Sequence, residues 1–316
     1  ARRTQDRRAS LVRVSQASPS AYWGLQEDVA RWHAIYALYS NDNLEGAAAL
    51  VEESSVGVRG QHLPFLQILE AEWATQSQGE RRRLTPWLEI EFVPAETGDG
   101  IDELAKVALA ACQMVGNRLD WQHEVPVRLS LLAEEPGSGY RLGYEVPKYP
   151  YEKICISPTT IHDGSFASVV AHEYGHVASE NMSASTIPTW VTEGVSIWVA
   201  NQLQSPRPFV DGSWLWRDPS ALEQVFATTW SPVRGELNDR WVAYQQAGQI
   251  VAHLASRGGE ASIARFLRAH ATNSWLRVVQ TSILGQRPTQ IALREVYKQD
   301  EPSVFRSARE LLASLG

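Results

Sequence analysis

"VVAHEYGHVASENMSASTIPTWVTEGVSIW", residues 169–198, holds two histidines, His172 and His176, that are four positions apart. On an α-helix this spacing places both imidazoles on one face, one turn apart, where they can bind the same metal ion. Glu173 lies one position after His172, about 100° around the helix, so it can face the same space without binding the metal. There it can accept a proton from a water molecule that a catalytic metal holds. The segment therefore predicts a metal site.

The third ligand has two candidates in this segment. Sixteen residues separate His176 from Glu193, which follows Pro188 in a second predicted helix. That length allows the first helix to end and an antiparallel helix to return past the histidines. Glu180 lies one turn beyond His176 on the same helix, where the face drifts by about 40° per four residues. Zinc prefers imidazole nitrogens plus one carboxylate and keeps a fourth position for water. The pattern favours Glu193 as the third ligand of one Zn²⁺.

These residues resemble a known family. "HEYGH" (172–176) followed by "IPTWVTEGVSIWV" (187–199) is similar to the gluzincin metallopeptidases, and most closely to peptidase MA-like domains. The later stretch "WVAYQQAGQIVAHLASRGGEASIARFLRA" (241–269) resembles the helix that follows in that family, so the likeness covers about residues 86–314. The resemblance implies a thermolysin-like fold, in which His172, His176 and Glu193 hold zinc and Glu173 is the general base and acid.

The resemblance also suggests a residue that stabilises the oxyanion. Gluzincins place a tyrosine or histidine on a helix after the third ligand, where it donates to the charge that develops in the transition state. Tyr244 matches this role by its order and pattern, with His253 and Tyr174 as alternatives. The other interpretation of Tyr244 is a tyrosine packed in the core.

Two features of the wider clan are missing from the sequence. The Gly-x-Met-Glu-Asn segment of the aminopeptidases does not precede His172, so the pattern favours an endopeptidase or oligopeptidase. Thr192 and Ile197 stand where thermolysin has an asparagine and an aspartate. Zinc-bound histidines need hydrogen-bond partners, and the candidates here are Ser196, Asn201 or a backbone carbonyl.

The order of predicted elements indicates an α+β fold, because strands come first and helices follow. Residues 1–85 are predicted to form an N-terminal helical appendage, and residues 86–316 the metallopeptidase-like domain, divided into a sheet part (86–164) and a helical part (165–316). Strands are expected within 87–95, 125–135, 140–146 and 151–158. Helices are expected at 21–39, 44–54, 63–76, 100–119, 165–180, 188–203, 218–229, 237–256, 259–271, 287–298 and 302–314.

Composition argues against several classes of partner. A net charge of -7 and a pI near 5.7 give no basic surface for nucleic acid. No apolar run approaches the roughly 18 residues that span a membrane. The two cysteines, Cys112 and Cys155, lie in apolar surroundings and are expected to be buried free thiols, with one disulfide between them as the alternative. The chain begins "ARRTQDRR" without Met, and exported proteins are common in the family, so an extracytoplasmic location is expected, with the cytoplasm as the alternative.

The leading hypothesis is zinc-dependent hydrolysis of a peptide or protein substrate. The alternatives are a catalytically silent zinc protein that binds peptides, a zinc hydrolase acting on another bond, or a chance motif. An extended substrate is expected to pair with an edge strand, either 140–147 or 127–132.

Overall fold

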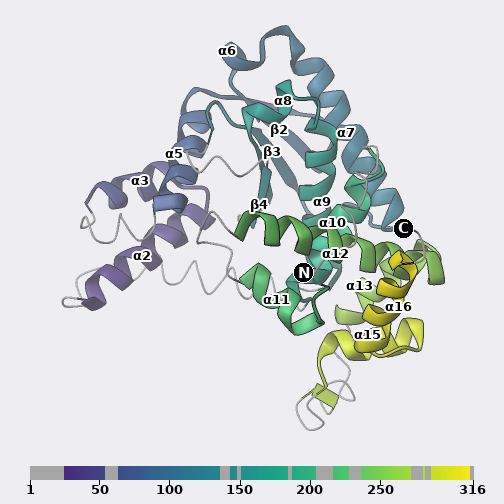
Figure 1. Ribbon diagram of the computed structural model, residues 1–316. Coiled ribbons are helices and arrows are strands. Elements are labelled where there is room, and N and C mark those ends of the chain that lie inside the picture. The colour runs from purple at the N-terminus through teal and green to yellow at the C-terminus, as the bar shows by residue number, and fades with distance from the viewer. Residues whose placement is uncertain are drawn as a thin grey trace. The chain divides into compact units, whose positions relative to one another are not determined.

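The computed structural model describes residues 25–53, 63–135, 143–147, 151–183, 187–203, 216–227, 236–271, 280–281 and 286–313 (Figure 1). The chain divides into two compact units. The first comprises Ala1–Ala110 and His123–Val170, and the second Ala111–Gln122 and Ala171–Gly316. The described part is mostly helical and contains one small mixed sheet, so the predicted α+β class is confirmed at this coarse level.

The sheet of the first unit has five strands in the order β1-β2-β3-β5-β4. Parallel pairs join β2, β3 and β5, and antiparallel pairs attach β1 and β4 at the two edges. The strands are β1 (Glu80–Arg83), β2 (Leu88–Phe92), β3 (Val127–Leu131), β4 (Gly143–Pro147) and β5 (Glu152–Ile156). The three inner strands are almost wholly buried, as expected for parallel strands with both faces covered.

The strand order corrects one of the two expected substrate strands. β3 is hydrogen-bonded to β2 on one side and to β5 on the other, so residues 127–131 offer no open edge to a substrate. β4 lies at an edge, although residues 140–142 of that second expected segment fall outside the described residues. β1 was not predicted, because its sequence "ERRR" is exposed throughout and has no apolar alternation. Charged side chains of this kind are typical of edge strands.

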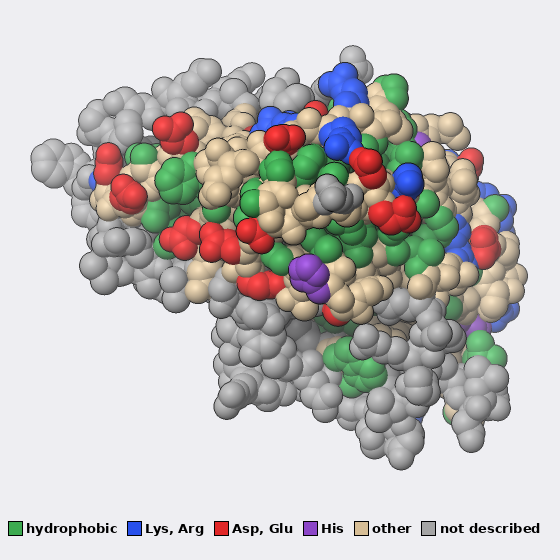
Figure 2. Space-filling model, turned by 90° about the horizontal axis from the view of Figure 1, so that it is seen from above, with side chains coloured by type: hydrophobic (Ala, Val, Ile, Leu, Met, Phe, Trp, Pro, Cys, Tyr) green, Lys and Arg blue, Asp and Glu red, His purple; other side chains and the backbone are tan. Residues whose placement is uncertain are grey.

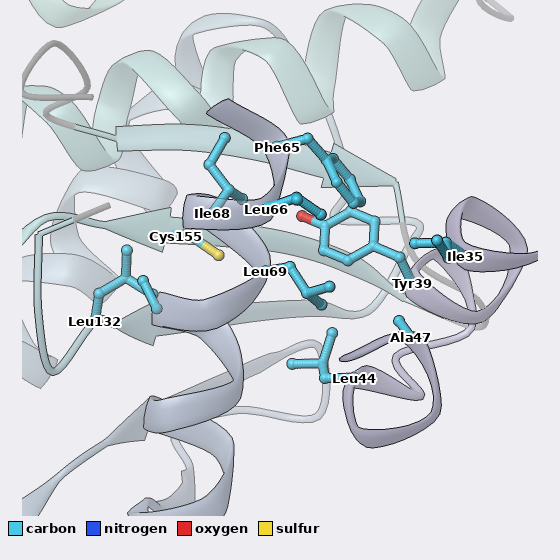
Figure 3. Packing of buried hydrophobic residues seen from close by; sticks show 11 residues of the cluster. Ile35, Tyr39, Leu44, Ala47, Phe65, Leu66, Ile68, Leu69, Leu132 and Cys155 are labelled. Carbon is cyan, nitrogen blue, oxygen red and sulfur yellow. The ribbon is translucent and has the colours of Figure 1, made fainter. Parts of the chain in front are cut away.

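The N-terminal helices share a core with the sheet. Helix α5 packs against β2 and β3 (Figure 1), and one apolar cluster joins α2, α3 and α5 to Leu132 and Cys155. Figure 3 shows Tyr39, Phe65 and Leu69 of this cluster pointing toward one another. The helices are α2 (Leu25–Ser40), α3 (Leu44–Glu52) and α5 (Leu63–Gln78). The predicted boundary between residues 85 and 86 falls inside the first compact unit.

A buried ion cluster reinforces this attachment. The Lys153 ammonium, on β5, lies 3.1 Å from Glu72 of α5, 3.4 Å from Asp42 and 3.6 Å from Glu91 of β2. Lys153, Glu72 and Glu91 are each at most 1% exposed. Burial alone would lower the pKa of Lys153, but the carboxylates, Glu72 above all, raise it well above the usual value. The lysine therefore stays charged, and it links the N-terminal helices to the strands.

Shorter helices connect the strands of the first unit, and the second unit is built from helices. The connecting helices are α6 (Pro94–Thr97), η2 (Gly98–Gly100) and α8 (Pro158–His162). Two long helices run from the first unit into the second, namely α7 (Ile101–Arg118) and α9 (Phe166–Ser183). The remaining helices of the second unit are α10 (Thr189–Ala200), α11 (Pro219–Ala227), α12 (Glu236–Gly258), α13 (Ala261–Ala271), α15 (Pro288–Tyr297) and α16 (Glu301–Ala313). Each of the helices predicted after residue 165 is present, with ends shifted by up to three residues.

Surface and cysteine predictions can also be compared with the structure. Charged side chains of both signs lie on the face in Figure 2, where Asp and Glu gather in a short row. None of the described helices combines the length and the apolar character needed to cross a bilayer. Cys112 and Cys155 are buried free thiols, as predicted.

Candidate metal centre

Helix α9 brings the two histidines of the motif together. His172 and His176 are partly buried, and their ring centroids lie 4.9 Å apart at an angle of 77°. Their Nε2 atoms are 3.2 Å apart. As predicted for residues four apart on a helix, both Nε2 atoms point to one place.

Helix α10 adds Glu193 to this pair. Glu193 Oε2 lies 3.4 Å from His172 Nε2 and 3.2 Å from His176 Nε2. This oxygen is buried, and both imidazoles lie within 3.4 Å of it. Three possible metal ligands thus converge on a common point, and His172, His176 and Glu193 form the only such group found among the described residues.

The size of this triangle fits zinc. Zinc lies about 2.0–2.2 Å from nitrogen and carboxylate oxygen ligands in tetrahedral sites, so two ligand atoms are about 3.3–3.6 Å apart. The three distances here are 3.2, 3.2 and 3.4 Å. Two imidazoles with one carboxylate are also a donor set that zinc prefers, and three protein ligands keep the fourth position open.

Glycines allow the helices of the site to approach closely. A Cβ added at Gly175, on α9, would lie 2.9 Å from Ser196 Oγ on α10. A Cβ added at Gly194, next to Glu193, would lie 2.6 Å from the carbonyl oxygen of Ala247 on α12. A Cβ at Gly194 would meet a backbone atom that cannot move aside easily, and a Cβ at Gly175 would displace the Ser196 side chain, so both positions favour glycine. The close contacts hold the backbone of α10 near both α9 and α12.

The electrostatics of the cluster favour positive charge. Burial alone would lower the pKa of His176, but the Glu193 carboxylate outweighs this effect and raises the pKa to about 9. Burial alone would raise the pKa of Glu193, but the two imidazoles, His176 first, lower it far below its usual range. A negative carboxylate is thus stabilised next to two nitrogen donors, and this environment suits a cation.

The two other carboxylates of the motif take different positions. Glu173 is 7% exposed, and its charge contributes to the raised pKa of His176, so it lies close enough to act on the site. Glu180 also raises the pKa of His176, but less than Glu173 does. Glu180 is not part of the converging group, as the drift of the helix face predicted.

Of the three residues considered for the oxyanion role, Tyr244 lies beside His172. Tyr244 lies on α12, and its ring centroid is 6.4 Å from that of His172. The same ring packs edge-on against Phe226, with the two centroids 5.3 Å apart. Tyr174 is fully buried and packs against Trp121 at 5.3 Å. His253 Nε2 instead lies 2.9 Å from Ser307 Oγ on α16. The geometry thus favours Tyr244 over its two alternatives.

Sequence reasoning missed the residues that hold α10 in place. Glu223, on α11, accepts hydrogen bonds from the backbone amides of Thr189 and Trp190 at 3.0 and 3.1 Å. Pro188 weakly indicates that α10 is capped by a residue from elsewhere in the chain. Its side chain cannot accept a hydrogen bond, so another acceptor is needed for the first amides of the helix. The sequence does not say which acceptor, because Glu223 is 30 positions after Glu193.

Comparisons of the chain with protein-family models, with curated proteins and with solved structures found no match.

Proposed function

We propose that the protein is a zinc-dependent peptidase of the gluzincin type, which hydrolyses peptide bonds in a peptide or protein substrate. The observation that carries the proposal is the triangle of His172 Nε2, His176 Nε2 and Glu193 Oε2, with sides of 3.2, 3.4 and 3.2 Å. Its donors and its size fit one Zn²⁺, and these three residues would hold the ion. A bound zinc ion supplies a Lewis acid that activates water and polarises a carbonyl group.

The residues of the chain supply the proton transfers. The Glu173 carboxylate accepts a proton from the attacking water and returns it to the nitrogen of the leaving amine. The overall reaction consumes one water and one peptide bond and yields a carboxylic acid and an amine, which are a carboxylate and an ammonium group at neutral pH. Burial of Glu173, at 7% exposed, keeps competing solvent away from this proton.

Tyr244 completes the proposed machinery. Its ring stands 6.4 Å from the ring of His172 and is partly exposed, so a substrate can reach it. Its hydroxyl donates a hydrogen bond to the carbonyl oxygen as that oxygen becomes negatively charged. The packing of Phe226 against the ring limits its motion.

The proposal includes membership of the gluzincins and a thermolysin-like arrangement. Support comes from the order of elements: a small mixed sheet with antiparallel edge strands precedes α9, which carries both histidines, and α10, which carries Glu193. The motif "HEYGH" with "PTWVTEG" agrees with this order.

Cleavage by a Glu173→Gln variant tests the proposal. We expect the zinc-loaded wild type to cleave members of a broad peptide library and the variant to retain about one zinc per chain. Its cleavage rate should fall by roughly 10²- to 10⁴-fold, because the general base is lost. Glu180→Gln is the matched control, since it removes a carboxylate one turn beyond His176, and it should cleave like the wild type. Undiminished cleavage by Glu173→Gln would contradict the proposed role, and a wild type that binds zinc and peptides without cleaving any would identify a silent binding protein.

A further inference from the structure

The first turn of α10 has no local cap. Its N-cap residue is Pro188, whose side chain makes no capping hydrogen bond. The first amides of a helix have no partner within the helix and need acceptors from elsewhere. Glu193 is the fifth residue of α10, so it stands one turn inside this end.

Glu223 supplies the missing cap from another helix. Its Oε1 accepts from the Thr189 amide at 3.0 Å and its Oε2 from the Trp190 amide at 3.1 Å. A carboxylate that accepts two backbone bonds at a helix N-terminus gains both from its charge and from the helix dipole.

Helix α11, which carries Glu223, is itself attached to α12. The side chain of Gln246, on α12, accepts from the Arg217 amide at 3.0 Å and donates to the Arg217 carbonyl at 2.6 Å. Asp218 caps α11 by accepting from two backbone amides at 2.9 and 2.8 Å. Phe226, at the other end of α11, contacts Tyr244. These contacts hold α11 in place, and they thereby fix the backbone position of Glu223.

We propose that Glu223 is a positioning residue for the metal site, which holds the first turn of α10 so that Glu193 meets His172 and His176. Glu193 Oε2 is buried and has both imidazoles within 3.4 Å, so the position of the α10 backbone decides whether this oxygen reaches them. Loss of the cap allows the first turn of α10 to fray, and Glu193 lies directly after that turn. This inference rests on the proposed function.

Zinc affinity measured without any substrate tests the inference. Zinc-free wild type, Glu223→Ala and Glu223→Gln are titrated with Zn²⁺ in competition with a chromophoric chelator. We expect the Kd to rise about tenfold in Glu223→Ala, as for the loss of a strong helix cap. The rise should be about two- to threefold in Glu223→Gln, because its single amide oxygen can still accept one of the two bonds. With Co²⁺ in place of zinc, the absorption spectrum of Glu223→Ala should also change, because the ligand geometry is altered.

Asn43→Ala is the matched control. Asn43 caps α3 in the first compact unit by accepting from the Gly46 amide at 3.0 Å, so its loss should lower the melting temperature and leave the zinc Kd unchanged. An unchanged Kd in Glu223→Ala would overturn the inference and leave the proposed function standing. If that variant does not fold, wild-type affinity in Glu223→Gln overturns it equally. A wild type that binds no zinc would refute the proposed function itself, and the inference with it.

Discussion

Tyr244 and Tyr174 show how neighbouring residues give two tyrosines of one chain different environments. Tyr244 stands beside His172 and is held by Phe226, whereas Tyr174, one position after Glu173, is buried against Trp121. Burial also raises the pKa of Tyr174 far above its usual value, so that hydroxyl stays protonated in the core. Two tyrosines near the candidate metal site therefore have different environments, and of the two only Tyr244 is partly exposed.

Removal of the Tyr244 hydroxyl should affect the reaction and not the metal. We expect Tyr244→Phe to lower kcat by roughly 10²- to 10³-fold, the usual loss for one oxyanion donor. KM and zinc content should stay near the wild-type values, because the hydroxyl acts only on charge that develops in the transition state. Steady-state kinetics on any substrate found by library cleavage measure this. Tyr174→Phe is the comparison, and an equal loss of kcat in both variants would speak against the assignment.

Local sequence patterns predict some residues of the candidate site and miss others. His172, His176 and Glu173 were identified because a four-residue spacing has a fixed meaning on a helix. Glu193 needed one further assumption, that the chain turns back within sixteen residues, and the structure brings it to the histidines. Glu223 could not be found, because its contact joins two helices whose packing is not encoded in any local pattern.

At the scale of elements, α10 is held by close contacts on several sides. It meets α9 at Gly175, α12 at Gly194 and α11 through the Glu223 cap. Trp190, at its start, is fully buried and packs edge-on against Phe305 of α16 at 5.2 Å. The helix that carries Glu193 thus has little freedom to shift, which is what a site of three converging ligands requires.

A methyl group at Gly194 should disturb this packing. We expect Gly194→Ala to lower the free energy of unfolding by about 1–3 kcal/mol, because the added carbon meets a backbone carbonyl that cannot move aside easily. Zinc affinity should weaken as well, since Glu193 is the adjacent residue. Urea unfolding and zinc titration measure the two effects. Gly100→Ala serves as the control, because nothing lies within 4 Å of a Cβ at that position. Wild-type stability in Gly194→Ala as well as in the control would show that the close contact at Gly194 does not matter for stability.

Elements differ in how well the sequence predicts them. The helices after residue 165 were predicted within three residues of their ends. β1 was missed because its four residues are charged and exposed. The order of strands was not predictable from alternation, since pairing is decided between segments far apart, and β3 therefore appeared as a possible edge strand although it is central.

At the scale of the whole molecule, the N-terminal helices belong to the architecture of the first unit. Their apolar faces pack with Leu132 and Cys155. The carboxylates of Glu72, on α5, and Asp42, in the turn between α2 and α3, lie close to the Lys153 ammonium of β5. The sequence predicted these helices from their local pattern but could not predict their docking, because it depends on long-range contacts. The predicted boundary at residue 86 therefore follows a change in local pattern, and the packing continues across it.

Replacement of Lys153 tests this attachment. We expect Lys153→Met to lower the free energy of unfolding by about 3–5 kcal/mol, because buried carboxylates then lose their partner. Lys106→Met is the control: Lys106 pairs with Glu103 on the surface, where both side chains are 74% exposed, and its loss should leave stability nearly unchanged. Chemical denaturation measures both variants. Equal stability of Lys153→Met and the wild type would show that the ion cluster does not hold the helices.

The most direct measurement of the central claim is the zinc content of the purified protein by elemental analysis after reconstitution and removal of excess metal. We expect about one zinc per wild-type chain, about one in Glu180→Ala, and loss of most of the metal in His172→Ala, His176→Ala and Glu193→Ala. No zinc in the wild type, or full zinc in Glu193→Ala together with its loss in Glu180→Ala, would contradict it.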